Sequence, residues 1–543
     1  MPNNKPYDAL IVGGGHNGLT CACYLAGAGL KVRVLERRAV IGGAAITEEF
    51  FPGFRNSAAA YTVSLLHPKV LRELRLAEHG LEIVERPVAN FLPLSEREYL
   101  KVGASLAATQ AELRRFSVRD AERLPAYYEL LERAGGALRE LTLETPPNVG
   151  GGASDLFAVL RAGNSLRKLD MHTRRDLLDF LTKSAGDLLD SWFETHAIKA
   201  AFGFDAIVGN FATPYAPGTG YVLLHHVIGE VNGKRGAWGH AVGGMGAITQ
   251  AMAQEAERRG VEITTECEVA KVVVDERGAQ GVQLPDGRVM EARCVVANVN
   301  PKLLFQQLLD PNVLDADFLE RIRAYKCASA TFRMNVALAE LPEFTCLPGS
   351  EVQEHHQAGI IIAPSLAYME QAYFDARTYG CSRAPIVEML IPSTVDDSLA
   401  PPGQHVASLF CQHFSPELPG NLQWDHVRED AADFVIDTVT KYAPNFKSAV
   451  IGRKILSPRD LERDFGLVGG DIFHGTLTLD QLWSARPVLG HANYRAPVHA
   501  LYMCGAGTHP GGGVSGIPGH NAAREIIRDF RWGKLNGKHR RKA

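Results

Sequence analysis

Three glycines near the start of the chain, Gly13, Gly15 and Gly18, are spaced as G-x-G-x-x-G, and an acidic residue, Glu36, follows them. In a strand–turn–helix unit the first glycine allows a tight turn, the second lets a pyrophosphate approach the backbone, and the third lets the helix pack closely on the strand. The free N–H groups at the helix start then face the phosphates. A carboxylate placed like that of Glu36 accepts hydrogen bonds from ribose hydroxyls. The pattern therefore predicts binding of an adenine dinucleotide.

The elements that must position these residues follow in the required order. Tyr7–Val12 has the apolar composition of a buried strand, a helix is expected from Leu19, and residues 29–36 are expected to form a second strand that ends in Glu36. The alternative is a glycine turn in an unrelated strand–helix–strand unit, with Glu36 as a surface acid. The N-terminal pattern by itself leaves both FAD and NAD(P) open.

Two further glycine groups could complete a cofactor site. Gly42 and Gly43 follow the second strand, where a glycine pair lets the backbone pass close to a cofactor, although a simple loop is the alternative. Residues 500–526 are expected to form a buried strand, a glycine-dense loop and a helix that begins near Pro518. Such a loop places backbone N–H groups against a flat, anionic group. A flavin needs this second contact and NAD(P) usually does not, so the C-terminal loop favours FAD.

Composition narrows the class of protein. The chain has 543 residues and a formal net charge of −4, which does not indicate a nucleic-acid partner. Its nine cysteines include no C-x-x-C pair, so dithiol–disulfide exchange is not expected and the cysteine usage fits a reducing compartment. No apolar run is long enough to span a bilayer, and no metal site is expected because the histidines lack cysteine or carboxylate partners at suitable spacing.

These features predict a cytoplasmic protein. The polar segment 1–6 runs directly into the first strand and leaves no room for a targeting peptide. In a eukaryotic source the mitochondrial matrix would be the alternative location. Peripheral contact with a membrane stays open, and the sequence does not indicate an oligomeric state.

The middle of the chain contains two regions with different predicted structures. A helix is expected at 247–259, followed by a β-meander with strands at 269–274, 281–284 and 289–292 and by a separate strand at 294–297. From 327 to 450, strands alternate with loops before a helix expected at 425–442. The second region therefore predicts a mixed-sheet domain that could wall off a substrate site.

Three separated motifs resemble those of the phytoene desaturase-like flavoproteins, the carotenoid/retinoid oxidoreductase family within the flavin amine oxidase superfamily. They are residues 13–18 with Gly42 and Gly43, the middle segment Gly243–Gly246, and Thr508–Gly513. The resemblance spans essentially the full chain and implies an α/β fold. It implies a discontinuous Rossmann-type FAD-binding domain with a β-meander insertion, formed by residues 1–75, 236–322 and 465–543. The substrate or lid domain, of α+β type with a mixed sheet and helices, would comprise residues 76–235 and 323–464.

The same resemblance implies which residues contact FAD. The glycines of the first motif would contact the pyrophosphate, Glu36 the adenosine ribose, and Val269 the adenine side through its backbone, while the C-terminal glycines would pass the flavin. The complete expected set is Gly13, Gly15, Asn17, Gly18, Glu36, Arg37, Gly42, Gly43, Ala44, Val269, Gly505, Gly512, Gly513 and Gly516.

The expected function is that of an FAD-dependent oxidoreductase. It would oxidise a C–H bond of a small or lipid-like, largely hydrophobic substrate by hydride transfer to flavin N5, as desaturases and dehydrogenases do. Because no second Rossmann fingerprint for NAD(P)H is recognised, oxygen or a quinone-like molecule is the expected electron acceptor. His474 is the candidate catalytic acid or base, with a structural histidine as the alternative. Two other functions stay open: a flavin amine oxidase, and a low-turnover flavoprotein with a regulatory or interaction role.

Overall fold

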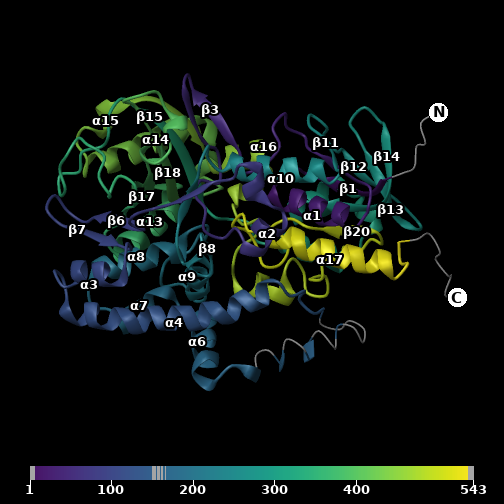
Figure 1. Ribbon diagram of the computed structural model, residues 1–543, viewed down its shortest axis with the longest axis horizontal. Coiled ribbons are helices and arrows are strands. Elements are labelled where there is room, and N and C mark those ends of the chain that lie inside the picture. The colour runs from purple at the N-terminus through teal and green to yellow at the C-terminus, as the bar shows by residue number, and fades with distance from the viewer. Residues whose placement is uncertain (1–6, 149–154, 156–158, 161–162, 165–166, 536–543) are drawn as a thin grey trace.

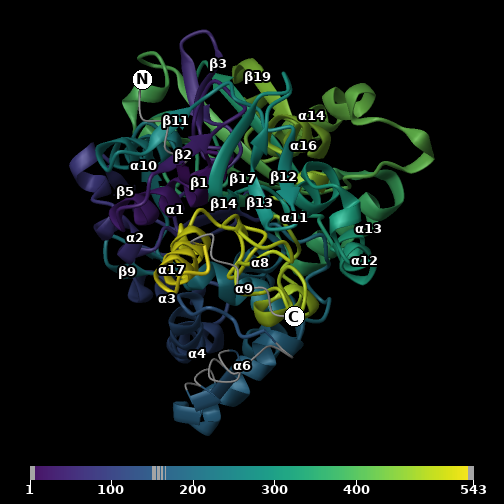
Figure 2. The same ribbon diagram turned by 90° about the vertical axis from the view of Figure 1, so that its right-hand side faces the viewer.

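The computed structural model describes residues 7–148, 155, 159–160, 163–164 and 167–535. Two seven-stranded sheets, each covered by helices, form the two halves of the molecule (Figures 1 and 2). The polar segment 1–6, which was expected not to be a targeting peptide, lies outside the described residues. Within the described ranges, no helix combines the length and the apolar character that crossing a membrane requires.

The first sheet is assembled from three distant parts of the chain. Its strand order is β11-β2-β1-β14-β13-β12, and β20 pairs with β14. The neighbours within β11-β2-β1-β14 and the pair β14-β20 are parallel, whereas β12, β13 and the first part of β14 form an antiparallel meander. The strands are β1 (Tyr7–Val12), β2 (Val32–Leu35), β11 (Glu262–Thr264), β12 (Lys271–Asp275), β13 (Gly278–Gln283), β14 (Val289–Ala297) and β20 (Leu501–Met503).

Alternate residues of β1 face two different cores, because successive side chains of a strand point to opposite faces. Ala9 and Ile11 pack in one hydrophobic cluster with helices α1, α10 and α17. Leu10 and Val12 pack in another, with the meander and α12. Figure 1 shows the helices of the first cluster lying together over β1. The helices are α1 (His16–Gly27), α10 (Gly246–Arg258), α12 (Ala316–Ala324) and α17 (Ile517–Arg531).

The second sheet has the strand order β19-β15-β18-β17-β16-β6-β7 and is mixed, because only the pair β16-β6 is parallel. Helix α14 covers one face, and a group of helices that includes α4, α8 and α13 covers the other. The strands are β6 (Asn90–Pro93), β7 (Tyr99–Val102), β15 (Thr331–Leu338), β16 (Gly359–Ile362), β17 (Cys381–Leu390), β18 (His405–Phe414) and β19 (Val450–Leu456). The helices are α3 (Leu106–Leu113), α4 (Val118–Thr142), α6 (Met171–Thr182), α7 (Ala185–Trp192), α8 (His196–Ile207), α9 (Thr219–Val227), α13 (Leu366–Tyr379) and α14 (Trp424–Thr440).

Short elements connect the two halves. Three two-stranded pairs are β3 (Thr47–Phe51) with β4 (Phe54–Ser57), β5 (Ile83–Glu85) with β10 (Gly239–Ala241), and β8 (Glu230–Val231) with β9 (Lys234–Arg235). Short helices are α2 (Pro68–Glu73), α11 (Pro301–Leu303), α15 (Phe446–Ala449) and α16 (Pro458–Phe465).

The structure confirms the helix expected at 247–259, which is α10, and the mixed sheet expected after residue 327. The prediction of separate strands at 289–292 and 294–297 was wrong, because both belong to the nine-residue strand β14. Arg293 interrupts the apolar pattern without ending the strand, since its guanidinium pairs with the Asp8 carboxylate at 2.6 Å. The predicted boundaries between the two domains stay predictions.

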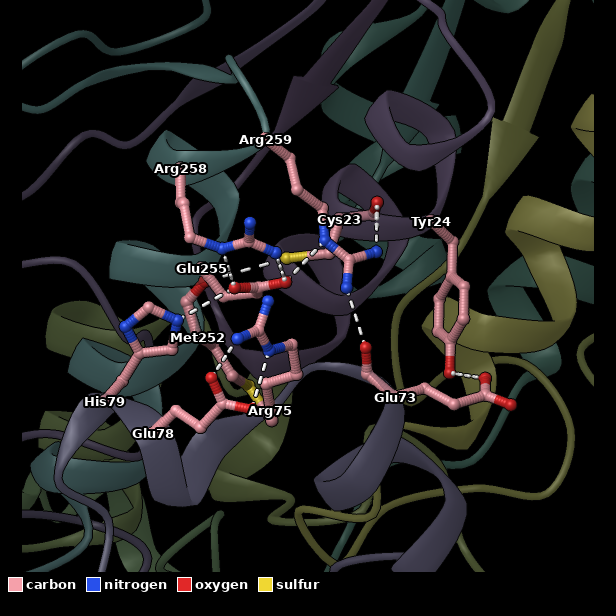
Figure 3. A network of polar contacts seen from close by, with 10 residues as sticks. All are labelled: Cys23, Tyr24, Glu73, Arg75, Glu78, His79, Met252, Glu255, Arg258 and Arg259. Atoms are coloured by element: carbon pink, nitrogen blue, oxygen red, sulfur yellow. Dashed lines mark hydrogen bonds and ion pairs between the residues drawn. The ribbon is translucent and has the colours of Figure 1, made fainter.

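A buried carboxylate, that of Glu255, ties three helical segments together (Figure 3). His79, Arg258 and Arg259 all contact it, at 2.6–2.8 Å. Arg259 also donates to the backbone carbonyls of Cys23 in α1 and Glu73 in α2. Burial opposes ionisation, but the hydrogen bonds from these three side chains outweigh it and lower the pKa of Glu255 to about 2. The interaction fixes α10 against α1, which carries the glycine motif at its start.

We expect Glu255→Gln to lower the free energy of unfolding by about 2–4 kcal/mol, because it leaves partly buried cations without their carboxylate. Urea unfolding measures the loss. Glu257→Gln, on the exposed side of the same helix, is the matched control and should change stability by less than about 0.5 kcal/mol.

The pH dependence of this difference follows from the lowered pKa. The contribution of Glu255 is complete above the ordinary value of 4.5 and is lost as the pH falls from there towards 2. The gap between wild type and Glu255→Gln should therefore shrink over that range. Equal losses in Glu255→Gln and Glu257→Gln would contradict the role given to Glu255.

Candidate cofactor and substrate site

The glycine motif forms the turn between β1 and α1, and close packing explains two of its glycines. Gly13 has a positive φ of 98°, which a residue with a side chain rarely adopts. A Cβ added at Gly18 would lie 2.4 Å from the Gly13 carbonyl oxygen, so only glycine lets α1 approach the turn this closely. Asn298, directly after β14, donates from its side chain to the same carbonyl at 3.1 Å.

A groove with a cavity volume of about 210 Å³ opens at the carboxyl ends of β1, β2 and β14. We call it the β1 groove. It brings together these residues predicted from the sequence: Gly13, Gly15, Asn17, Glu36, Arg37, Gly43, Ala44, Val269 and His474. In open parallel sheets, ligands bind at the carboxyl ends of the strands, at the point where the strand order reverses.

Glu36 lines the β1 groove directly after β2. Its carboxylate accepts hydrogen bonds from the backbone N–H groups of Gly14, at 2.8 Å, and Arg38, at 2.9 Å, and the residue is buried. These bonds fix the carboxylate at the end of β2. Because an ionised carboxylate has about four acceptor positions, it can still accept bonds from two neighbouring hydroxyl groups.

Four buried polar atoms of residues that line the β1 groove have no hydrogen-bond partner among the described residues. They are His16 Nε2, Asn17 Oδ1, Arg38 Nη1 and His474 Nδ1. Leaving such atoms unpaired costs about 1–3 kcal/mol each, so a polar ligand is the physical reason to expect them there. Together with the glycine backbone, they fit a dinucleotide that has hydrogen-bonding groups along its edge.

A second cavity, which we call the inner chamber, adjoins the β1 groove. His16, Ala44, Leu467, His474 and Ala506 line both. The remaining lining is mostly apolar and includes the aromatic rings of Tyr61, Trp238, Phe410 and Phe473, together with Gly512 and Gly513. The two predicted glycine regions therefore meet at one place, although about five hundred residues separate them in sequence.

Four predicted glycines lie outside both sets of lining residues, and the structure gives them packing positions. Gly18 contacts the Gly13 turn, as described above. A Cβ on Gly42 would meet the Thr249 side chain and the Ala45 carbonyl, and one on Gly516 would meet Val70 and Thr20. Gly505 lies against Asn298. Contacts of these four residues with a cofactor stay predictions.

One buried guanidinium holds the segment that carries His474. Arg486 is fully buried, and it donates to the carbonyls of Phe473 at 2.7 Å and Ala506 at 2.9 Å, and to those of Gly475, Thr476 and Gln481. It thus fixes the 473–481 segment against the loop after β20. His474 itself has a positive φ of 56°.

Both groove histidines are neutral at pH 7. Burial, aided by the charge of Arg486, lowers the pKa of His474 to about 4. Burial and the neighbouring His474 lower the pKa of His16 to about 3. Each imidazole is therefore a neutral hydrogen-bonding group, and a catalytic role for His474 stays a prediction.

A buried polar cluster forms one wall of the inner chamber. The Tyr61 ring stacks on Phe410 with centroids 4.7 Å apart, and the guanidinium of Arg333 lies 4.7 Å from the Tyr61 centroid. The Tyr61 hydroxyl donates to the carboxylate of Glu388. Burial raises the pKa of Glu388, although the charge of Arg86 opposes the shift.

Sequence reasoning missed the residues of this wall and also Asn298 of the β1 groove. Asn298 could have been found, because it ends the strand next to β1, where ligands bind. Tyr61, Phe410 and Glu388 lie in no motif and come from separate loops and strands, so no local signal marked them. Among the described residues, no group of three or more His, Cys, Asp or Glu side chains could hold a metal ion.

Comparisons with known proteins agree with this geometry. The family model described as flavin containing amine oxidoreductase matches residues 18–332. Pyridine nucleotide-disulfide oxidoreductase domain-containing protein 2 of Rattus norvegicus is 42% identical over 97% of this chain and 94% of its own length. A phytoene desaturase (lycopene-forming) of Pseudescherichia vulneris is 26% identical over 94% of this chain and 96% of its own. Cyclohexylamine oxidase from Brevibacterium oxydans IH-35A has a similar fold, with a TM-score of 0.56 at 16% identity, covering 97% and 100% of the two chains.

These findings establish the cofactor and the fold class. The matching family and the oxidase folds are flavin enzymes, so FAD is the cofactor, and the Rossmann-type FAD domain with a mixed-sheet substrate domain is confirmed. The name of the rat relative refers to disulfide chemistry, but all nine cysteines of this chain are free thiols. Because the family model covers more than half of the chain and the rat relative aligns with nearly all of it, the chain belongs to the flavin containing amine oxidoreductase family and is a flavin-dependent oxidoreductase.

Proposed function

We propose that the chain oxidises a C–H bond of a largely apolar organic substrate in the inner chamber, in the manner of a desaturase or dehydrogenase. FAD bound along the β1 groove would supply the two-electron acceptor, at flavin N5. The observation that carries the proposal is the junction of the two cavities. The residues shared by groove and chamber support it, because a dinucleotide bound along the groove would end beside an apolar wall.

The chain's own residues would bind, orient and exclude water. Gly13 and Gly15 leave room for the pyrophosphate, and the Glu36 carboxylate would accept from the ribose hydroxyls. His16 and His474, both neutral, would hydrogen-bond polar atoms at the junction through Nε2 and Nδ1. The aromatic and aliphatic lining keeps the reacting carbon dry, which strengthens the electrostatic interactions there.

We also propose that the electrons leave to oxygen or to a quinone-like acceptor. The other G-x-G-x-x-G match in the sequence, Gly511–Gly516, lies in the loop that lines the inner chamber, so we assign it to the flavin and not to a separate NAD(P)H site. The phytoene desaturase relative supports a hydrophobic substrate for this chain.

A second candidate is a flavin amine oxidase. The inner chamber has a cavity volume of only about 120 Å³, and aromatic rings make up much of its wall. A small aromatic chamber suits a compact amine, and cyclohexylamine oxidase shares the fold. The experiments below separate the two candidates.

The first prediction concerns FAD retention. Gly15→Val should lower the ratio of flavin to protein absorbance after purification by about 10–100-fold, because its side chain fills the space meant for the pyrophosphate. Gly163→Val, at an exposed glycine with no heavy atom near its Cβ position, is the control. Equal flavin content in a folded Gly15→Val protein would contradict the binding site.

The second prediction concerns the substrate. In anaerobic titrations, isoprenoid hydrocarbons should bleach the flavin band, whereas amines and NADPH should not. Bleaching by amines alone would establish the second candidate. A flavin that no organic donor reduces would instead favour the low-turnover role, and bleaching by NADPH would point to a reductase.

The third prediction concerns His474. His474→Asn should keep FAD, because asparagine tolerates the positive φ at this position. It should slow flavin reduction by about 100-fold if the imidazole positions substrate or cofactor. Stopped-flow reduction with the donor identified in the titration measures this, with His491→Asn as a control outside both cavities. An unchanged rate would leave His474 with a structural role only.

A further inference from the structure

A third cavity lies in the substrate half of the molecule, and we call it the outer chamber. It has a cavity volume of about 890 Å³ and is bounded by α4, α8, β5–β7 and the segment after β9. It is several times larger than the inner chamber, which at about 120 Å³ holds only a small part of an extended molecule. A long substrate that reacts in the inner chamber needs such a second space.

A single aromatic side chain separates the two chambers. Trp238 lines both of them. On the inner side its ring stacks on His226, with an angle of 15° between the planes and centroids 6.3 Å apart. On the outer side the Arg86 guanidinium lies 5.7 Å from its centroid. Arg86 donates to the hydroxyl of Thr62, which lines the inner chamber. The wall at this point is therefore one residue thick.

Asp205 is the unpaired carboxyl of the outer chamber. It lies on the face of α8 that also presents Ala201 and Phe202 to the cavity, and no described residue pairs with its side chain. The other charged side chains that line the chamber are paired, as Lys234 with Glu85, Arg235 with Glu132, and Arg86 with Glu388. Within the described residues, Asp205 is thus the acid left for a ligand.

The surroundings keep this carboxyl protonated near neutral pH. Burial, together with the negative charge of Glu388, raises the pKa of Asp205 to about 8. The titratable and charged groups near it are Tyr127 and Tyr128 of α4, His226 of α9, Glu388 of β17, and Arg86. A protonated carboxyl donates a hydrogen bond, which an ionised one cannot do.

We propose that the outer chamber holds the carbonyl-bearing end of an elongated, otherwise apolar substrate, with the carbonyl oxygen accepting from Asp205 and the hydrocarbon part passing Trp238 into the inner chamber. This inference rests on the proposed function and adds the substrate class. A neutral oxygen acceptor fits better than an ammonium group, because a cation would first require the carboxyl to ionise. The apolar and aromatic neighbours of Asp205 suit the adjoining carbon chain.

The test measures binding of nonan-2-one to the FAD-loaded protein by calorimetry, with the amine of the same skeleton, 2-aminononane, as the comparison ligand. We expect Asp205→Leu to weaken ketone binding about 5–10-fold, the worth of one hydrogen bond. Asp205→Asn keeps a donor and should bind within about threefold of wild type. Raising the pH from 7 to 9.5 should weaken ketone binding to wild type and leave Asp205→Asn unchanged.

Two further measurements decide the outcome. Ketone binding should perturb the flavin absorbance, because the carbon chain reaches the inner chamber. Binding that depends on Asp205 but leaves the absorbance unchanged would overturn the passage at Trp238. Tighter binding of the amine, lost in Asp205→Asn, would overturn the carbonyl assignment, as would ketone binding that is indifferent to Asp205. None of these measurements needs turnover, so a protein that binds ketone but oxidises nothing would reject the proposed function and keep this inference.

Discussion

The contact on which the site depends is the one between Gly18 and the Gly13 carbonyl. It brings the start of α1 onto the end of β1 with no side chain between them, so the N–H groups at the helix start open into the β1 groove. The neighbouring strands then determine what else reaches the groove. β2 ends with Glu36, and β14 is followed by Asn298, whose side chain locks the same carbonyl. A larger residue at Gly18 would push α1 away from both the end of β1 and Asn298.

A second constraint acts at the opposite end of the β1 groove, where Arg486 organises a segment that has no regular strand or helix of its own. Its guanidinium satisfies several backbone carbonyls that would otherwise be buried unpaired. Because those carbonyls belong both to the His474 segment and to the loop after β20, the junction between groove and inner chamber keeps one shape. The same positive charge contributes to keeping His474 neutral. Arg486 therefore both holds the segment in place and lowers the pKa of its histidine.

The parts of the site that sequence predicted are those encoded by local patterns. The G-x-G-x-x-G turn, Glu36 and the C-terminal glycines each sit in a recognisable strand–loop–helix context, and a periodic apolar pattern located α10. The charge of Arg293 led to the wrong prediction that β14 is two strands. Asp8 of another strand compensates this charge, and no local pattern reveals that pairing. The tertiary fold alone brings Tyr61 against Phe410 and places Asp205 in the outer chamber. Their roles depend on burial and on missing partners, which are properties of the assembled structure.

The last strand of the first sheet, β20, lies far along the chain from β1: β1 ends at Val12 and β20 begins at Leu501. During synthesis, the N-terminal strands therefore wait for almost the whole chain before β20 and α17 can close the groove. Contacts of such large sequence separation form slowly, and the unfinished sheet exposes a strand edge in the meantime. FAD bound to both glycine regions, as we propose, would stabilise the sheet after this last folding step. The supply of flavin would then control the amount of folded protein as well as the amount of active protein.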